Sequence, residues 1–436
     1  MKVRIYLLMF AVMTGPMVWF RLGSFGDISP TISMLFFLGF IIASSRYVIH
    51  EVVFVVKKNS VLVLGAALFV VSAMISLFHV PSAYTLSDIF RLVVYAALGL
   101  LVGGWLSKAK DEMVQKLVWL APATFFLTIM AFGYSTQAKG INAFQMLTSA
   151  VVQANPKIIE YSIFRSAFTA GVEEARANFR HDMAGALLVS IVVSLTLLKR
   201  EVAQVRRFIV ILGIVASAGF ILISMSRSVS IALLFASLII LFLGVLGRKK
   251  IRPMWIFYGL LSFFLMAGVL QQFSGVILAR FLAEDQVQSY SGRAEMISYG
   301  LSLINESVFS GTAFDGREDS MHNVILQHWV GGGVIAGVSA ILLLAVLFAQ
   351  LIRVARIVLA YKKYNLDCIY SLPAIAGFVA LPLVRALTAG AGLGASDWIS
   401  IGMLIGFWSR VGRIRSGLPE ANNEALSFAG RPAFYR

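Results

Sequence analysis

Runs of about twenty apolar residues recur along this chain, and they limit its possible folds more than any other feature. The hydrocarbon core of a bilayer is about 30 Å thick, and a helix needs about 20 apolar residues to cross it. The composition agrees, because 59% of the 436 residues are hydrophobic and only 13% are charged, whereas soluble domains carry about 25% charged residues. The sequence therefore predicts an all-α polytopic membrane protein.

Twelve such runs predict about twelve transmembrane helices in one domain, residues 1–410, followed by a cytoplasmic tail at 411–436. The first run resembles a signal peptide, but no small-residue cleavage site follows it, so we expect a retained helix. The expected spans are residues 5–20, 31–49, 61–79, 89–107, 114–132, 182–198, 208–226, 228–246, 254–271, 322–352, 366–388 and 397–410.

The charged residues predict which side of the membrane each loop faces. Cytoplasmic loops of membrane proteins carry an excess of Lys and Arg. If both termini are cytoplasmic, 25 of the 37 Lys and Arg lie on that side, together with only 7 of the 21 acidic residues. The net charge of +16 is then a topology signal and gives no support to nucleic-acid binding. Cys368 is the single cysteine, so the chain has no internal disulfide.

Two of the predicted outer loops, residues 133–181 and 272–321, are too long to be simple turns. Each contains short apolar patches between polar residues, such as IIEYSIF and YGLSLI. This pattern is typical of short helices that lie on a membrane surface. We therefore expect two larger periplasmic loops that carry such helices.

Arginine dominates the basic residues on the predicted outer side, where it supplies ten of twelve. A guanidinium group binds phosphate oxygens through two parallel hydrogen bonds and keeps its charge in a partly dry site. Some of these arginines, such as Arg21 and Arg91, can equally anchor helix ends at lipid headgroups. Arg227 is harder to explain in this way, because it interrupts the long apolar stretch ILISMSRSVSIALLF. A charge at that depth is costly and favours a functional role.

The second long loop contains Arg280 and Arg293 and leads directly to His322. Asp319 and Ser320 precede this histidine and are suitable N-caps for a helix that begins there. A helix N-terminus disfavours an imidazolium ion, so we expect the His322 ring to be neutral and able to accept a proton.

The residues after His322 suggest packing rather than chemistry. His328 is six residues further on and faces another side of the same helix, so we expect a packed or hydrogen-bonded histidine without metal-ligand spacing. The following GGGVIAG sequence favours close helix packing through small residues.

Arginines and one neutral histidine on the outer side favour a reaction of an anionic substrate, and a lipid pyrophosphate suits them. Such a leaving group departs readily once its charge is countered, so the protein has to hold the phosphates and take a proton from an incoming hydroxyl. The chain shows no zinc-ligand spacing, phosphate-binding loop or redox motif. We expect no cofactor and no metal, with arginine in place of a cation.

Three segments together resemble the O-antigen ligase and O-antigen polymerase superfamily. They are SRS at 226–228, SGRAEMISYGLSLINESVFSGTAF at 291–314 and MHNVILQHWVGGGV at 321–334. The family pattern is a serine-arginine turn, an arginine before a glycine-containing turn, and a His-Asn-x-x-Leu helix start with glycines downstream. In this chain Phe309 stands where the family turn usually has proline.

The resemblance implies an inverting, metal-independent glycosyltransferase in the bacterial inner membrane, with both termini cytoplasmic and its active site facing the periplasm. Its donor would be a glycan on undecaprenyl pyrophosphate, and the ligase acceptor would be lipid A–core. By this resemblance His322 is the general base on the acceptor hydroxyl, and Arg227 and Arg293 hold the pyrophosphate.

Three further residues have weaker or supporting roles by the same resemblance. Arg280 matches the pattern less well than Arg293. Arg180, just before the sixth predicted span, is expected to add a contact to the pyrophosphate from the first long loop, and Asn323 supports His322.

Other functions are compatible with parts of the pattern. A polymerase, whose acceptor is a second lipid-linked repeat unit, uses the same donor chemistry, although the compact length favours the ligase. A flippase or transporter is disfavoured because such proteins show internal repeats and polar residues at mid-membrane, and here the charges gather at the ends of the spans. A non-catalytic scaffold would leave the excess of outer arginines unexplained.

Overall fold

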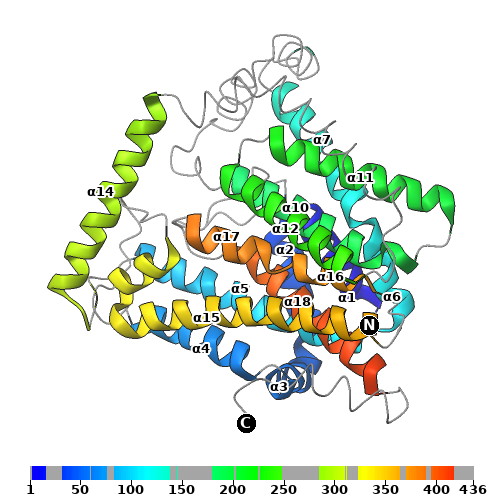
Figure 1. The fold of residues 1–436 in the computed structure, drawn as a ribbon, viewed down its shortest axis with the longest axis horizontal. Helices are drawn as coiled ribbons and strands as arrows, with labels where there is room; N and C mark the ends of the chain where they lie inside the picture. Colours follow the sequence, from blue (N-terminus) through cyan, green and yellow to red (C-terminus); the bar gives the residue numbers. More distant parts are fainter. Residues whose placement is uncertain are drawn as a thin grey trace.

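The computed structural model describes residues 2–15, 32–58, 60–75, 83–137, 145, 179–200, 203–223, 226–247, 284–309, 311, 323–363, 370–388 and 394–416. Within these residues every regular element is helical (Figure 1). The α-helices are α1 (Lys2–Met13), α2 (Ile32–Ser44), α3 (Val48–Lys58), α4 (Ser60–Ile75), α5 (Ala83–Lys108), α6 (Asp111–Gln115), α7 (Leu120–Gln137), α10 (Phe179–Leu197), α11 (Gln204–Ile223), α12 (Arg227–Leu246), α14 (Glu284–Glu306), α15 (Val324–Lys363), α16 (Leu372–Gly377), α17 (Ala380–Thr388) and α18 (Ala395–Ser416). Three short 3₁₀ helices join them, η1 (Ser45–Tyr47), η3 (Lys116–Trp119) and η6 (Leu198–Arg200).

The all-α prediction is confirmed for the described residues, and eleven of the twelve expected spans contain a helix. The remaining span, 254–271, lies outside them. Four of the described helices are long and apolar enough to cross a membrane, or five if α2 and α3, which meet at 90°, form one bent span. The other described apolar helices are shorter than a membrane span requires, so the total of twelve transmembrane helices stays a prediction. Large apolar side chains are exposed on several helices, among them Phe208, Leu212, Leu238, Leu241 and Phe242.

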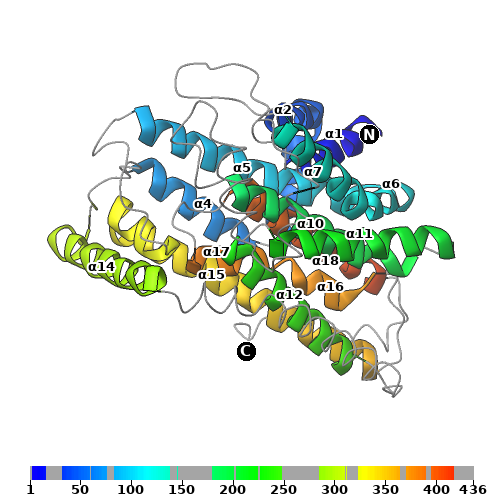
Figure 2. The same cartoon turned by 90° about the horizontal axis from the view of Figure 1, so that it is seen from above.

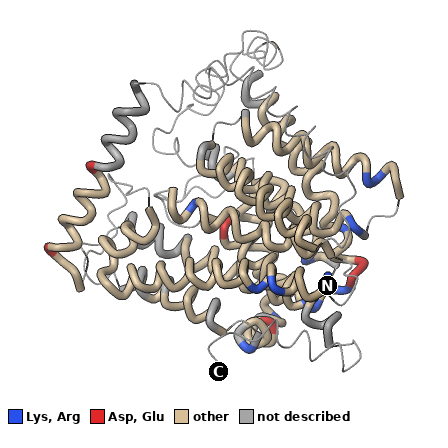
Figure 3. Tube along the Cα trace, viewed as in Figure 1, with Lys and Arg blue, Asp and Glu red and all other residues tan. Residues whose placement is uncertain are grey.

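Basic residues gather at one end of the helix bundle (Figure 3). Arg4, near the start of α1, pairs with Glu51 of α3 at 2.6 Å. Arg410, late in α18, donates to the carbonyls of Leu106 and Ala109 at the end of α5, both at 2.7 Å, and pairs with Asp111. We call this end, where α1 begins and α5 and α18 finish, the basic end. The opposite end is called the distal end.

Packing between helices fixes their directions relative to these two ends. Ser371, just before α16, donates its backbone N–H to the carbonyl of Thr196 near the end of α10 (3.0 Å). A Cβ on Gly247, which follows α12, would lie 3.0 Å from Val358 Cγ1 in the second half of α15. α10 and α12 therefore finish near the basic end, and they begin at the distal end together with α15 and α18.

Glycines allow α5 and α18 to approach until their backbones touch. A Cβ on Gly99 would lie 2.5 Å from Trp398 O, and a Cβ on Gly402 would lie 2.3 Å from Gly99 O. Gly103 and Gly406 extend the same contact by one turn on each helix. The two helices thus pack in parallel through a GxxxG pattern on each side, an arrangement that small residues permit in membrane helices.

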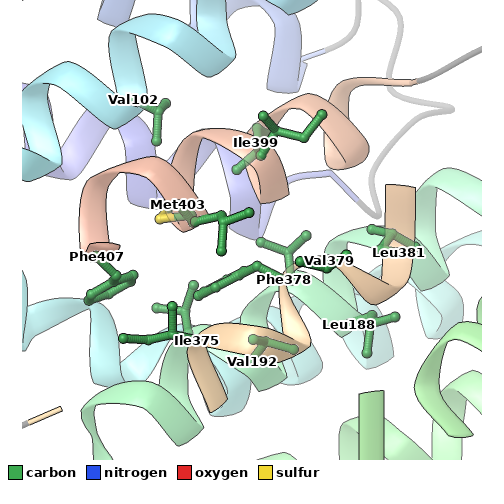
Figure 4. Close-up of a cluster of buried hydrophobic side chains, with 14 of the residues drawn as sticks. Val102, Leu188, Val192, Ile375, Phe378, Val379, Leu381, Ile399, Met403 and Phe407 are labelled. Carbon is green, nitrogen blue, oxygen red and sulfur yellow. The ribbon is translucent and has the colours of Figure 1, made fainter. Parts of the chain in front are cut away.

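Aliphatic and aromatic side chains fill the centre of the bundle between α5, α10, α16, α17 and α18 (Figure 4). Phe378 and Phe407 stack there, with ring centroids 5.8 Å apart and an interplanar angle of 11°. Val192 and Ile375 are buried beside them. This core holds in place the helices whose starts lie at the distal end.

The long helix α15 covers the expected span 322–352 from Val324 onward and is long and apolar enough to cross a membrane, but it is not continuous. Gly332 (φ −124°, ψ 16°) and Gly333 (φ 69°, ψ −165°) leave the helical conformation and divide it. A positive φ with this ψ is accessible only to glycine. α15 thus consists of a leading segment, residues 324–331, and a longer following segment.

The helix α14 crosses the distal end of the bundle. Figure 1 shows it at a steep angle to α4 and α15, and Figure 2 shows its end beside the start of α15. This helix lies within 272–321, where we expected short helices on the membrane surface. Its position relative to a membrane stays a prediction.

Candidate functional site at the distal end

The predicted site residues fall on helices that begin at, or lie across, the distal end. Arg227 is the first residue of α12, and Arg180 is the second residue of α10. Arg293 lies within α14. The side chains of these three arginines are outside the described part of the structure, as are Arg280 and His322 entirely. The backbone therefore brings three of the four arginine positions to one end, while their convergence around a substrate stays a prediction.

Asn323 is the one predicted site residue whose side chain is described. Its Oδ1 accepts hydrogen bonds from the backbone N–H groups of Ile325 (2.9 Å) and Leu326 (3.3 Å). This is an N-cap, which satisfies two of the N–H groups that a helix start leaves without an intrahelical partner. The expected caps, Asp319 and Ser320, lie outside the described residues, and α15 begins later than predicted, at Val324. His322 therefore precedes the cap residue in the sequence.

The leading segment of α15 carries His328 into the protein. This histidine is 4% exposed, in agreement with the expectation of a packed residue. Val324 and Val330 of the same segment are also buried. The segment is therefore packed against the bundle along one side, which fixes the position of Asn323 at its outer end.

A buried ion pair lies deeper in the bundle than the starts of these helices. Arg385 Nη1 of α17 is 3.1 Å from Asp397 Oδ2 of α18, and both side chains are almost completely buried. Asp397 Oδ2 also accepts the backbone N–H of Gly394 at 2.8 Å, which stabilises the start of α18. Charges in an apolar interior are stable only when they are paired and hydrogen-bonded.

The helix α10 passes directly over this ion pair. A Cβ on Gly185 would lie 3.1 Å from Ser396 Cβ and 3.8 Å from Arg385 Nη1. Gly185 is five residues after Arg180, which corresponds to about 7.5 Å along the helix. The ion pair thus lies about one and a half turns deeper than Arg180 and beside the same helix.

Two cavities lie among the described residues, and Asn323, the predicted site residue with a described side chain, lines neither of them. One, of about 70 Å³, lies between α1, α2, α5, α10 and α18 and includes Ser33, Tyr95 and Ser396. The other, of about 230 Å³, is an apolar groove between Leu68 of α4 and the following segment of α15. The first is too small for a sugar. In the described part of the chain no three His, Cys, Asp or Glu side chains lie together as metal ligands would.

Neither Arg385 nor Asp397 was predicted from the sequence as a site residue. One signal was available: two charges of opposite sign interrupt consecutive apolar runs twelve residues apart. Ionisable residues within membrane segments tend to pair with each other, so this spacing could have suggested the ion pair.

Comparisons of the chain with protein-family models and with curated proteins gave no match.

Proposed function

We propose that this protein is a glycosyltransferase of the O-antigen ligase type, in the inner membrane of a bacterium. It transfers a glycan from undecaprenyl pyrophosphate to lipid A–core at the periplasmic face. The observation that carries the proposal is the grouping of motif positions at the distal end: Arg180 is the second residue of α10, Arg227 the first of α12, and Asn323 directly precedes α15, while α14 with Arg293 crosses this end.

The charge distribution supports the proposed orientation. Basic residues gather at the opposite end, where α1 begins (Figure 3), and such residues favour the cytoplasmic side. In this orientation both termini are cytoplasmic and the distal end faces the periplasm, where the lipid-linked glycan and the lipid A–core are both available.

In the proposed reaction His322 takes the proton from a hydroxyl of the acceptor sugar. The hydroxyl oxygen attacks the anomeric carbon from the side opposite the pyrophosphate, and the new C–O bond forms as the bond to the pyrophosphate oxygen breaks. The electron pair leaves with undecaprenyl pyrophosphate, and the configuration at the anomeric carbon inverts. Arg227 and Arg293, with Arg180 and Arg280, counter the negative charge that the leaving group gains.

A deletion strain tests the assignment and separates the two family activities. The ligase proposal predicts full-length O-antigen ladders that stay on the lipid carrier and are not attached to lipid A–core. Lipid A–core bearing a single repeat unit would instead indicate the polymerase. Unchanged lipopolysaccharide would contradict both activities.

A further inference from the structure

The turn that follows α14 is seated in the break of α15. The backbone N–H of Val334, the first residue after the break, donates to the carbonyl of Val308 at 3.0 Å. The turn itself is closed by Gly311 N–H to Ser307 O and by Ser307 Oγ to Gly311 O, both at 3.0 Å. The break thus provides a backbone donor that a continuous helix would use internally.

Glycine is required on both sides of this contact. Gly311 has φ +72°, and a Cβ there would lie 2.6 Å from Gly333 N and 2.7 Å from the carbonyl oxygens of Val330 and Gly331. Gly333 has φ 69°. Neither residue can be replaced without strain or displacement. A Cβ on Gly311 would collide with rigid backbone, and the positive φ of both residues is unfavourable for any residue other than glycine.

We infer that this contact, between the turn Ser307–Gly311 and residues 331–334, is a joint that sets the position of α14 relative to the leading segment of α15. Gly311 and Gly333 are positioning residues. This inference rests on the proposed function for its catalytic meaning, because α14 carries Arg293 and the leading segment begins at Val324, directly after its cap Asn323 and next to His322 in the sequence.

The distances along the two helices determine how far a displacement at the joint would move Arg293 and Asn323. Arg293 is 13 residues before the end of α14, or about 20 Å along the helix. Asn323 is nine residues before Gly332, or about 14 Å along the leading segment. A small rotation at the joint is therefore multiplied by these lengths, and a displacement of about 1 Å at a reacting group lowers the rate by about 10²-fold.

Two kinds of variant test the joint. Gly311→Ala introduces the steric conflict. Val334→Pro removes the N–H that Val308 O accepts and replaces the half-buried valine side chain. It lies at a first helical position where proline is well tolerated, so this variant is expected to fold even if Gly311→Ala does not. Gly244→Ala in α12 is the matched control, because a Cβ there has no atom within 4 Å.

Spin labels on Leu301 and Ile335, both exposed, report the position of α14 in a Cys368→Ser background. We expect one narrow distance distribution in the parent protein and in Gly244→Ala, and a broadened or shifted one in Gly311→Ala and Val334→Pro. A broad distribution in the parent, or an unchanged one in both variants, would overturn the joint whether or not the protein transfers glycan.

Transfer kinetics with purified protein, undecaprenyl-pyrophosphate-linked glycan and lipid A–core test the catalytic meaning. We expect the two joint variants to lose about 10²-fold in kcat and to show a raised KM for the donor. Partial unfolding alone lowers the active fraction and leaves that KM unchanged, so a fall in kcat without a rise in donor KM would overturn the positioning role. A parent protein without transfer would overturn the proposed function, while the distance measurement would still decide the joint.

Discussion

Arg385 and Asp397 join two helices through a buried ion pair, with Arg385 Nη1 and Asp397 Oδ2 3.1 Å apart. Removing one partner leaves an uncompensated buried charge, which typically costs about 3–5 kcal/mol. We predict that Arg385→Met strongly lowers the midpoint of thermal unfolding in detergent. The double variant Arg385→Met/Asp397→Asn should lose less than the sum of the two single variants, because no unpaired charge remains.

The control for this pair is Arg356→Met, since Arg356 is an exposed arginine on α15. This variant should unfold at the same temperature as the parent. Strictly additive losses in the double variant would show that the two charges do not stabilise each other in the folded protein.

The parallel contact of α5 and α18 should be intolerant of any side chain at Gly402. A Cβ there would lie 2.3 Å from Gly99 O, so Gly402→Ala has to separate the helices, and overpacking of this kind costs roughly 1–3 kcal/mol. We predict a lower unfolding temperature and a smaller folded fraction by size-exclusion chromatography. Gly219→Ala in α11 has open space around the new methyl group and should behave as the parent; equal behaviour of the two variants would refute the contact.

The N-cap at Asn323 predicts a distinction between two small substitutions. Asn323→Ala removes the acceptor for the N–H groups of Ile325 and Leu326, a loss of about 1 kcal/mol. Asn323→Ser keeps an acceptor oxygen without adding charge beside the proposed pyrophosphate site. We expect Ala to reduce glycan transfer in the purified assay and Ser to retain most of it; if both lose transfer equally, Asn323 acts through something other than the cap.

The proposed phosphate contacts predict a strong effect of a charge-conserving change. Arg227→Lys and Arg293→Lys keep the positive charge but lose the paired hydrogen bonds of the guanidinium group. We expect both variants to reach the membrane normally and to transfer glycan at least about tenfold more slowly, with Arg356→Lys as the unaffected control. Parental rates in both would argue against direct phosphate binding.

Much of the fold follows from the hydrophobic pattern alone, because an apolar run in a membrane protein leaves little choice but a helix. The stretch around Arg227 is the clearest case: two expected spans meet at 226–228, and α12 begins at Arg227. Helix directions were also predictable, since successive membrane spans alternate in direction whatever the length of the loop between them.

Details that depend on tertiary contact were not predictable in the same way. GGGVIAG predicted close packing through small residues, and the turn after α14 does pack against the backbone of residues 330–333. The local sequence did not show that Gly332 and Gly333 also break α15 at this contact. The cap residue was misplaced because Asp319, Ser320 and Asn323 are all good caps, and the local sequence does not rank them. The spacing of Arg385 and Asp397 could suggest a pair, but their contact depends on α17 and α18 lying side by side.

The proposed role of His322 as the base in glycan transfer from a lipid pyrophosphate can be measured with purified protein. Parent protein and His322→Ala are each reconstituted with undecaprenyl-pyrophosphate-linked glycan and lipid A–core. We expect glycosylated lipid A–core with inverted anomeric configuration from the parent, and none from an equally well folded His322→Ala. Absence of product from the parent, or equal product from the variant, would contradict it.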